Sequence, residues 1–445
     1  MKLESKYLES QIEIVADKFA EAIATKEIFV ISHFDTDGIT SATILIQTLK
    51  KLDKRFSVKI VKRLEEETIL NLPKDKVIIF LDLASGSLDY ISKLNQKDIF
   101  IIDHHEIFQA VPEGMNIVNP ELNGKEKLSS SSLVYLFCKS LAGENKELAK
   151  LAILGMIGDC MEKSIDKLNN LIINDGEVKK KRGLLIYPST RPLNRTLEYC
   201  SDPYIPDITG NAVGVTELLR DVGLTPANGK YKSLIELDDT EMSKLVTAIM
   251  LKNPKVKNKE IIGDIFLIKL FNKLEDAREL SAMINACSRM GESETAIQFC
   301  MESSKAKKKA ELMHAKYKQH IISGLKSAAE SEKVEGNGFV IINAKGKIKD
   351  TIIGTIASIL SNSSIYEPGT IITTMAYYDD KIKISARSVG KAERNIREVL
   401  TSVINQIGGE VGGHEFAAGC MIKQEKEKEF IEALKKSLEI ELVKI

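Results

Sequence analysis

The stretch Asp98-Ile-Phe-Ile-Ile-Asp103-His104-His105 places one carboxylate and two imidazoles directly after a short run of large apolar residues. A run this short, rich in isoleucine and without helical spacing, predicts a buried β-strand. The strand is therefore expected to end at Asp103. Because neighbouring residues on a strand face opposite sides, we expect both histidines on an irregular turn that follows the strand.

Two earlier apolar runs also lead into polar side chains. Residues 27–32 precede a His-Phe-Asp-Thr-Asp-Gly sequence at 33–38, and residues 76–81 precede Asp82. Between the first run and the second, residues 39–52 have apolar side chains at helical spacing. Strands that alternate with helices predict a parallel sheet. The carboxyl ends of parallel strands lie along one edge of the sheet, which is where such sheets bind ligands.

The predicted sheet edge gathers carboxylates and imidazoles from distant parts of the chain, namely Asp35, Asp37, Asp82, Asp103, His104 and His105. So many acceptors without a nearby basic partner would repel one another unless a cation lay among them. Carboxylates and imidazoles together suit Mn²⁺, Mg²⁺ or Zn²⁺. A further carboxylate, Asp159, follows the apolar helix expected at 147–157, and we expect it to be the last ligand.

Composition bounds the class of protein. A length of 445 residues predicts two or three domains. Lysine plus arginine and aspartate plus glutamate balance at 63 each, so any site for a polyanion must be a local patch. The six cysteines show no C-x-x-C spacing, which is typical of reduced thiols in the cytosol. No apolar run reaches the ~18 residues of a membrane span, so we expect a cytoplasmic protein without a membrane partner.

Beyond the metal-binding domain expected at 1–164, the character of the sequence changes. Residues 165–275 predict a helical intervening segment without strands, and residues 276–330 a helical connector. A second, smaller α/β domain is expected at 331–445. It contains a glycine-rich stretch at 408–419, expected to be a loop, whose bare backbone could bring amide N–H groups close to a phosphate. The predicted fold class is therefore α/β, with the active site in a groove between the first and last domains.

The motifs together resemble the DHH/DHHA1 phosphoesterase superfamily. The order is H-x-D-x-D-G, a strand-end aspartate, D-H-H, G-D, and finally G-G-x-x-G-G-H-x-x-A-A-G at 408–419. Further similar phrases are N-A-C-S-R at 285–289 and S-A-R-S at 385–388. The chain is most similar to the archaeal RecJ-like nucleases, including the kind associated with GINS. One residue departs from the family pattern, since Ser288 stands where the family has glycine.

The resemblance implies a role for each matched residue. Two divalent ions, Mn²⁺ in preference to Mg²⁺, are expected to bind the metal set His33, Asp35, Asp37, Asp82, His104 and Asp159, with Asp82 as the bridge. His105 and Asp103 are expected to be catalytic, with His105 facing the scissile phosphate. Substrate is expected to bind Ser385, Arg387, Gly412, Gly413 and His414, assisted by Asn285 and Arg289.

The function that the resemblance implies is a metal-dependent, single-strand-specific exonuclease of DNA replication or repair. It would release mononucleotides from single-stranded DNA, with RNA open as a second substrate and with GINS or the replicative helicase complex as a partner. One alternative is a phosphodiesterase for oligoribonucleotides or cyclic dinucleotides. Others are a family inorganic pyrophosphatase and a non-catalytic replisome subunit, the last of which predicts eroded ligands. The sequence leaves the polarity of digestion open.

Overall fold

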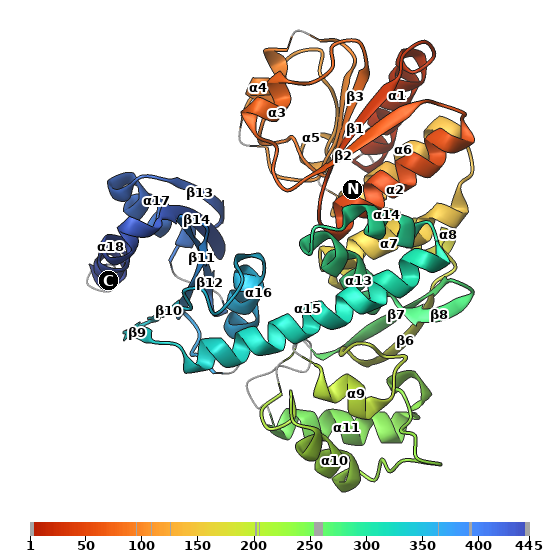
Figure 1. The fold of residues 1–445 in the computed structure, drawn as a ribbon. Helices are drawn as coiled ribbons and strands as arrows, with labels where there is room; N and C mark the ends of the chain where they lie inside the picture. Colours follow the sequence, from red (N-terminus) through yellow and green to blue (C-terminus); the bar gives the residue numbers. More distant parts are fainter. Residues whose placement is uncertain are drawn as a thin grey trace. The chain divides into compact units, whose positions relative to one another are not determined.

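The fold is described from a computed structural model of the chain (Figure 1). The structure describes residues 4–94, 96–107, 109–124, 126–200, 203, 205–252, 261–363, 365–390 and 394–440. The chain divides into two units. Unit one contains Met1–Arg182 and Asp264–His314, and unit two contains Gly183–Gly263 and Ala315–Ile445. Each unit is described by itself.

Unit one is built on a five-stranded sheet in which every neighbouring pair of strands is parallel, as the sequence predicts. Its order is β2-β1-β3-β4-β5. The strands are β1 Ile28–His33, β2 Phe56–Val61, β3 Val77–Leu81, β4 Ile99–Ile102 and β5 Asn116–Val118. The short apolar runs thus form the centre of the sheet, while β2, with its partly exposed side chains, lies at an edge.

Helices cover both faces of this sheet because the side chains of its central strands alternate between two apolar cores. On β3, Val77, Ile79 and Leu81 belong to the larger core, whereas Ile78 and Phe80 belong to a smaller one. Helices that contribute to the larger core are α1 Glu4–Ala22, α2 Thr36–Lys51, α6 Ser130–Ala142, α7 Ala149–Gly158, α8 Lys167–Asp175, α13 Ala277–Arg289, α14 Ser293–Cys300 and the first turns of α15 Ser304–Glu330. The smaller core contains residues of α3 Glu66–Leu70 and α4 Leu88–Ser92.

The expectation that 165–275 contains no strand is wrong. A three-stranded sheet of order β6-β7-β8 is formed by β6 Lys179–Leu184, β7 Ile262–Leu270 and β8 Lys273–Asp276. The first of these strands begins with the run Lys179-Lys-Lys-Arg182. Those side chains are largely exposed on an edge strand, where charge is tolerated and discourages further strand pairing.

The rest of the intervening segment is helical, as predicted, and has an apolar core of its own. Its helices are α9 Leu193–Glu198, α10 Ala212–Asp221 and α11 Asp239–Lys252. These three helices belong to unit two, whereas α8, also within 165–275, belongs to unit one. The long helix α15 Ser304–Glu330 begins in unit one and continues the chain into unit two.

Unit two contains a second, mixed sheet of order β13-β14-β12-β11-β10-β9. Only the β10–β11 pair is parallel among the pairings that the structure describes in this sheet. Its strands are β9 Lys333–Gly336, β10 Phe339–Asn343, β11 Ile371–Tyr378, β12 Lys381–Ser388, β13 Glu410–His414 and β14 Ala417–Lys423. Helix α16 Asp350–Ser361 contacts one face, where Thr374 donates to the Ile353 carbonyl. Helices α17 Ile396–Ile407 and α18 Glu427–Ile440 share a core with alternate side chains of β12 and β14.

The glycine-rich stretch is not the loop that we expected. Its residues form β13, the turn at Glu415 and Phe416, and β14, so that their backbone groups pair in an antiparallel ladder. Glycine is needed here for strand contact. A Cβ atom at Gly413 would lie 2.3 Å from the Ala417 carbonyl oxygen, and one at Gly419 would lie 2.8 Å from the Ile384 carbonyl oxygen.

Candidate metal centre

Three neighbouring strands of unit one end level with one another and carry polar residues at or just after their ends. Strand pairing places Ser32 opposite Leu81 and Leu81 opposite Ile102, so His33, Asp82 and Asp103 follow at the same edge. Strand β4 ends at Ile102, and the two histidines lie in irregular backbone beyond it, as predicted.

Two further carboxylates come from the start of α2. Asp35 caps this helix by accepting a hydrogen bond from the Gly38 amide at 3.0 Å. Asp37 lies in the first turn and accepts the amides of Ser130 and Ser131 at 2.6 and 3.0 Å, at the N-terminus of α6. The positive end of that helix dipole stabilises the Asp37 carboxylate.

Two glycines allow the chain to approach these carboxylates. A Cβ atom at Gly38 would lie 2.3 Å from the carbonyl oxygen of His33, so only glycine permits the tight turn from strand to helix. A Cβ atom at Gly155, on α7, would lie 2.3 Å from Oδ1 of Asp37. The glycine of α7 therefore leaves the space into which the carboxylate fits.

Asp82 lies at the middle of the cluster. Its Oδ2 is 3.4 Å from Nδ1 of His33, and its Oδ1 is 3.5 Å from Nε2 of His104. Asp35 and Asp159 each lie beside one of these two imidazoles. Asp35 Oδ2 is 3.0 Å from His33 Nδ1, and Asp159 Oδ2 is 3.3 Å from His104 Nε2.

Three overlapping groups of side chains could each hold a cation. They are His33 with Asp35 and Asp82, then Asp82 with His104 and His105, and then Asp37 with His104 and Asp159. Within each group the possible ligand atoms lie within 4.8 Å of one another. Asp82 and His104 each belong to two groups, which is the arrangement expected of side chains shared between neighbouring ions.

The Asp82 carboxylate provides the test of whether the site fits a cation. Its side chain is 1% exposed, and among the residues that the structure describes neither oxygen has a hydrogen-bond partner. Its backbone is also in the left-handed region, with φ of +59°. Burying a carboxylate without a hydrogen bond costs several kcal/mol, and a left-handed backbone roughly 1–2 kcal/mol more. A bound divalent cation would offset both costs, so the residues present fit a metal ion.

The pKa values of the cluster show the same electrostatic conflict. Burial raises the pKa of Asp82 well above its usual range, and the charges of Asp35, Asp37, Asp159 and Asp103 raise it further. Burial likewise raises the pKa of Asp159, and Asp37 and Asp35 add to the effect. Burial alone would raise the pKa of Asp35, but the hydrogen bond and charge of His33 lower it below the usual range. A divalent cation would bring all of these groups into the ionised form.

Asp103 is fully buried and does not point its oxygens into the cluster. They accept the Ser85 amide at 2.9 Å, the His104 amide at 2.8 Å and Nδ1 of His105 at 2.7 Å. Burial would raise the pKa of Asp103, but the hydrogen bonds from His105 and Ser85 hold it below the usual range. Asp103 therefore builds the turn and orients His105, and it acts through that imidazole.

His105 is the most exposed imidazole of the D-H-H sequence, with 48% of its side chain accessible. Burial lowers its pKa, but the hydrogen bond and charge of Asp103 outweigh burial and raise the pKa above the usual value. Asn119 holds the same turn by donating to the His105 carbonyl at 2.9 Å and to Ser85 Oγ at 3.0 Å. His105 is thus a partly exposed imidazole at the rim of the cluster, and Asp103 favours its protonated form.

Asn285 and Arg289 lie beside the cluster on α13. Arg289 donates from Nε to Oδ1 of Asn285 at 3.0 Å, and its guanidinium lies 5.7 Å from the ring centre of Phe34, next to His33. Ser288, where the family has glycine, does not disturb the path to Arg289, since α13 continues through both residues. The Ser288 side chain is buried, and its Oγ has no hydrogen-bond partner in the described ranges.

Four of the five remaining predicted residues share one face of the sheet in unit two. Strand register aligns Ser385 with Gly419 and Gly412, and Arg387 with Ala417 and His414. Alternate residues of a strand lie on one face, so Ser385, Arg387, Gly412 and His414 share it, while Gly413 falls between them.

The Arg387 guanidinium is held in place on that face. Arg387 donates from Nε to Ser358 Oγ on α16 at 3.1 Å and from a terminal nitrogen to the Ala386 carbonyl at 2.8 Å. The fork of this arginine is therefore oriented by the protein and does not move freely in solvent.

Two exposed cations at the edge of the first sheet were missed by reasoning from the sequence. Lys62 and Arg63 directly follow Val61, which pairs with His33, so the sheet places them at the same edge as the cluster. No ion pair to either side chain is found within the described ranges. The signal was available, because both residues directly follow the alternating polar and apolar residues at 57–61, which form most of β2.

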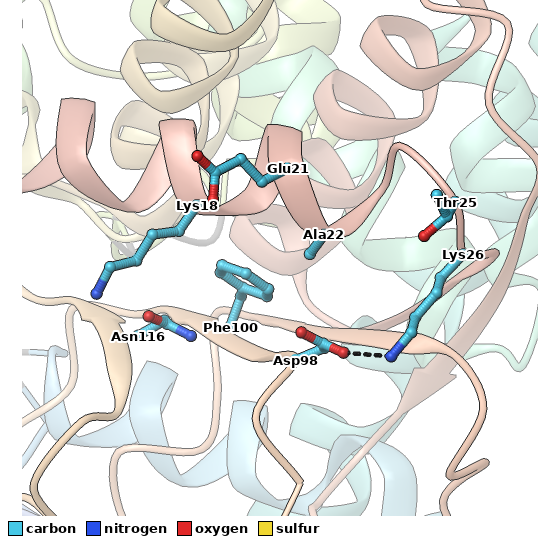
Figure 2. Close-up of a pocket in the computed structure, with 8 residues that line it drawn as sticks. All are labelled: Lys18, Glu21, Ala22, Thr25, Lys26, Asp98, Phe100 and Asn116. Atoms are coloured by element: carbon cyan, nitrogen blue, oxygen red, sulfur yellow. Dashed lines mark hydrogen bonds and ion pairs between the residues drawn. The ribbon is translucent and has the colours of Figure 1, made fainter.

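A cavity of about 420 Å³ lies elsewhere in unit one (Figure 2). It is lined by Lys18, Glu21, Ala22, Thr25, Lys26, Asp98, Phe100 and Asn116, and an ion pair of 2.6 Å joins Lys26 to Asp98. Asp98 precedes β4 and Asn116 begins β5, so this cavity lies at the amino ends of the strands. It is at the opposite edge of the sheet from the cluster and has no part in it.

Family comparisons identify the class of protein. The DHH family N-terminal domain matches residues 27–158, the DHH-CID domain residues 186–261 and the DHHA1 domain residues 337–439. An uncharacterized protein of Methanocaldococcus jannaschii is 31% identical over 421 residues, which cover 90% of this chain and 91% of that protein. The chain belongs to the DHH/DHHA1 superfamily and is homologous to the RecJ exonucleases.

The RecJ homology covers part of the chain in sequence. The single-stranded-DNA-specific exonuclease RecJ of Bacillus subtilis is 29% identical over 160 residues, which cover 32% of this chain and 20% of that protein. The chain thus spans only a small share of this relative's length. The match concerns a shared region and not the activity of the whole relative.

Solved structures share the fold across nearly the whole chain. RecJ from Thermus thermophilus in complex with Mn²⁺ has a TM-score of 0.61 at 18% identity, covering 96% of this chain and 54% of that one. CDC45 from Entamoeba histolytica has a TM-score of 0.67 at 12% identity, covering 96% and 99%. At these identities the likeness concerns the fold alone.

No described helix has both the length and the apolar character needed to cross a membrane.

Proposed function

We propose that this protein is a metal-dependent exonuclease that hydrolyses single-stranded DNA from one end to mononucleotides. The observation that carries the proposal is the Asp82 carboxylate, which is buried at the meeting point of two candidate ligand groups and has no hydrogen-bond partner in the part of the chain described. The homology to a protein named as a single-stranded-DNA-specific exonuclease supports the choice of substrate.

The ligand set that we propose has six members, His33, Asp35, Asp37, Asp82, His104 and Asp159. It would hold two divalent ions, Mn²⁺ in preference to Mg²⁺, with Asp82 between them. When bound, such a pair supplies positive charge to both the attacking and the leaving oxygen of a phosphodiester and a hydroxide at neutral pH. The protein supplies the spacing, because three strand ends and the start of α2 fix the ligand atoms before any ion arrives.

The cations around the cluster would bind the substrate's phosphates. His105, whose protonated form is favoured by its hydrogen bond to Asp103, would offset negative charge on the phosphoryl oxygens as the reaction proceeds. Arg289 lies beside residues 33–35, here called the metal loop, and would contact the same phosphate. Lys62 and Arg63, at the neighbouring strand end, would bind the next phosphates of the strand.

In unit two, Ser385, Arg387, Gly412, Gly413 and His414 would hold the substrate's backbone or its end. Aromatic residues make up only 6% of the chain and tryptophan is absent, so contacts to phosphates should outweigh base stacking. Weak sequence preference and salt-sensitive binding follow. We extend the proposal to RNA as a second substrate, to a role in DNA replication or repair, to GINS or the replicative helicase complex as a partner, and to a cytoplasmic location.

The test is digestion of end-labelled single strands with Mn²⁺, using DNA and RNA of equal sequence and the matching duplexes. Wild type should release mononucleotides from one end of the single strands, and Asp82→Asn should not. Asp98→Asn is the matched control, because it makes the same chemical change at the opposite edge of the sheet. Cleavage confined to di- to pentanucleotides would overturn the exonuclease in favour of a small-substrate phosphodiesterase, and equal activity in wild type and Asp82→Asn would overturn the role of the cluster.

A further inference from the structure

Phe34 lies between two residues of the metal cluster and outside the two apolar cores described for unit one. It separates His33 from Asp35 and is partly exposed. Its ring contacts the His33 ring edge-on, with centres 5.0 Å apart and planes at 88°. Neither apolar core of unit one includes Phe34 in the part of the chain that the structure describes. An ordinary core-packing role therefore does not account for an aromatic residue at this position.

The Phe34 ring also contacts Arg289, whose guanidinium lies over it at 5.7 Å from its centre. Arg289 donates from Nε to Asn285 at 3.0 Å. A guanidinium has five N–H donors, of which four remain on the two terminal nitrogens. Among the described residues those four make no hydrogen bond. The hydrogen bond from Nε and the contact with the Phe34 ring thus hold the guanidinium of Arg289 in place, while its two terminal nitrogens are available to a ligand.

This arrangement suits an oxyanion. Two parallel N–H donors from a planar, oriented guanidinium match two oxygens of a phosphoryl group. The support comes from a residue of the metal loop itself, so the direction of the fork is set by the loop that carries His33 and Asp35.

We propose that Phe34 is a positioning residue, which holds the guanidinium plane of Arg289 so that its fork binds a phosphoryl group at the metal cluster. The inference rests on the proposed function for the identity of the substrate, but the phosphate contact can be measured without turnover. A cation that lies over an aromatic ring is stabilised by the face of that ring. Phe34→Leu therefore removes the support for the Arg289 guanidinium, while Phe34→Tyr retains it.

The experiment measures the affinity of the Mn²⁺-loaded full chain for inorganic phosphate by titration calorimetry. Phe34→Leu should weaken phosphate binding roughly 2- to 30-fold, and Phe34→Tyr should remain near wild type. In an Arg289→Lys background the Phe34→Leu change should have little further effect, because the planar fork is already gone. Affinity for Mn²⁺ itself, measured in the same way, should be unchanged in Phe34→Leu.

Three results would overturn the inference. Phe34→Leu could bind phosphate as wild type does, Phe34→Tyr could lose as much affinity as Phe34→Leu, or the effects of Phe34→Leu and Arg289→Lys could simply add. A parallel loss of Mn²⁺ affinity would instead assign Phe34 to the structure of the metal loop. Because phosphate binding is separate from nuclease activity, a wild type that digests no nucleic acid would refute the proposed function and leave this test intact.

Discussion

Oδ1 of Asp103 lies 2.7 Å from Nδ1 of His105, while the remaining acceptor capacity of Asp103 is occupied by backbone amides. The aspartate of the D-H-H sequence is thus directed away from the ligand cluster, and the second histidine is directed toward the rim of that cluster. The hydrogen bond both orients the imidazole and raises its pKa.

The first prediction concerns the pH dependence of turnover. The pKa of His105 is raised by Asp103, so the imidazolium persists to higher pH in wild type than it would alone. Asp103→Asn removes the negative charge and lowers that pKa. The alkaline limb of the profile of kcat against pH should therefore move to lower pH. An alkaline limb at the same pH in both proteins would show that His105 does not act as an imidazolium.

The second prediction concerns stability without metal. The pKa of Asp82 is raised in the folded state, so protonated Asp82 stabilises the fold. This stabilisation is fully present below the pKa that Asp82 has in the unfolded chain, and it is lost as the pH rises through the pKa that Asp82 has in the folded protein. In EDTA, Asp82→Asn should melt at a higher temperature than wild type near about pH 7.5, and this advantage should shrink toward about pH 4.5. Mn²⁺ should raise the melting temperature of wild type more than that of the variant.

The control for this prediction is Asp98→Asn, which alters a partly exposed ion pair at the other edge of the sheet. It should change stability by less than about 1 kcal/mol at any pH in the range. If Asp82→Asn were the less stable protein in EDTA at neutral pH, the electrostatic conflict inferred for the cluster would be refuted.

The third prediction tests the space around Asp37. A Cβ atom at Gly155 would lie 2.1 Å from Ser131 Oγ and 2.3 Å from Asp37 Oδ1. Gly155→Ala should therefore displace the carboxylate and weaken Mn²⁺ binding about 10- to 100-fold, the effect typical of disturbing groups that orient metal ligands. Overpacking should also cost about 1–3 kcal/mol of stability.

Gly86→Ala is the matched control, since nothing lies within 4 Å of a Cβ atom there and the backbone does not adopt a positive φ. Calorimetric titration with Mn²⁺ and thermal melting of both variants provide the measurement. Unchanged Mn²⁺ affinity in Gly155→Ala would remove Asp37 from the ligand set.

The fourth prediction concerns unit two. Arg387→Lys keeps the positive charge but loses the planar fork that Ser358 and the Ala386 carbonyl orient. It should raise KM for single-stranded DNA about tenfold with little change in kcat, because the interaction binds substrate and transition state alike. Lys436→Gln, on a helix that covers the opposite face of the sheet, should leave both constants unchanged. A fall in kcat alone would argue against a role in binding.

The convergence of carboxylates and imidazoles at one edge of the sheet could be predicted because it depends on patterns that a sequence displays. Short isoleucine-rich runs before His33, Asp82 and Asp103 are typical of buried parallel strands, and parallel strands bring their ends together. Strand β6 could not be predicted in the same way. Its Lys179-Lys-Lys-Arg182 run has no apolar alternation, and its pairing partner β7 lies about 80 residues further along the chain.

The direction of individual side chains was the other gap. Whether Asp103 points into the cluster depends on the turn after β4, which Ser85 and Asn119 stabilise from separate segments. The stacking of Arg289 on Phe34 depends on how α13 packs against the start of α2, which no local pattern reveals. The glycine-rich stretch was misassigned because glycine serves both phosphate-binding loops and closely packed strands.

The most direct test of the central claim is anomalous diffraction at the manganese absorption edge from crystals grown with Mn²⁺. The account predicts two peaks about 3.5–4 Å apart, with the Asp82 carboxylate between them and with Asp35 and His104 on either side. An absence of anomalous density around Asp82, with its oxygens still unpaired, would contradict the account.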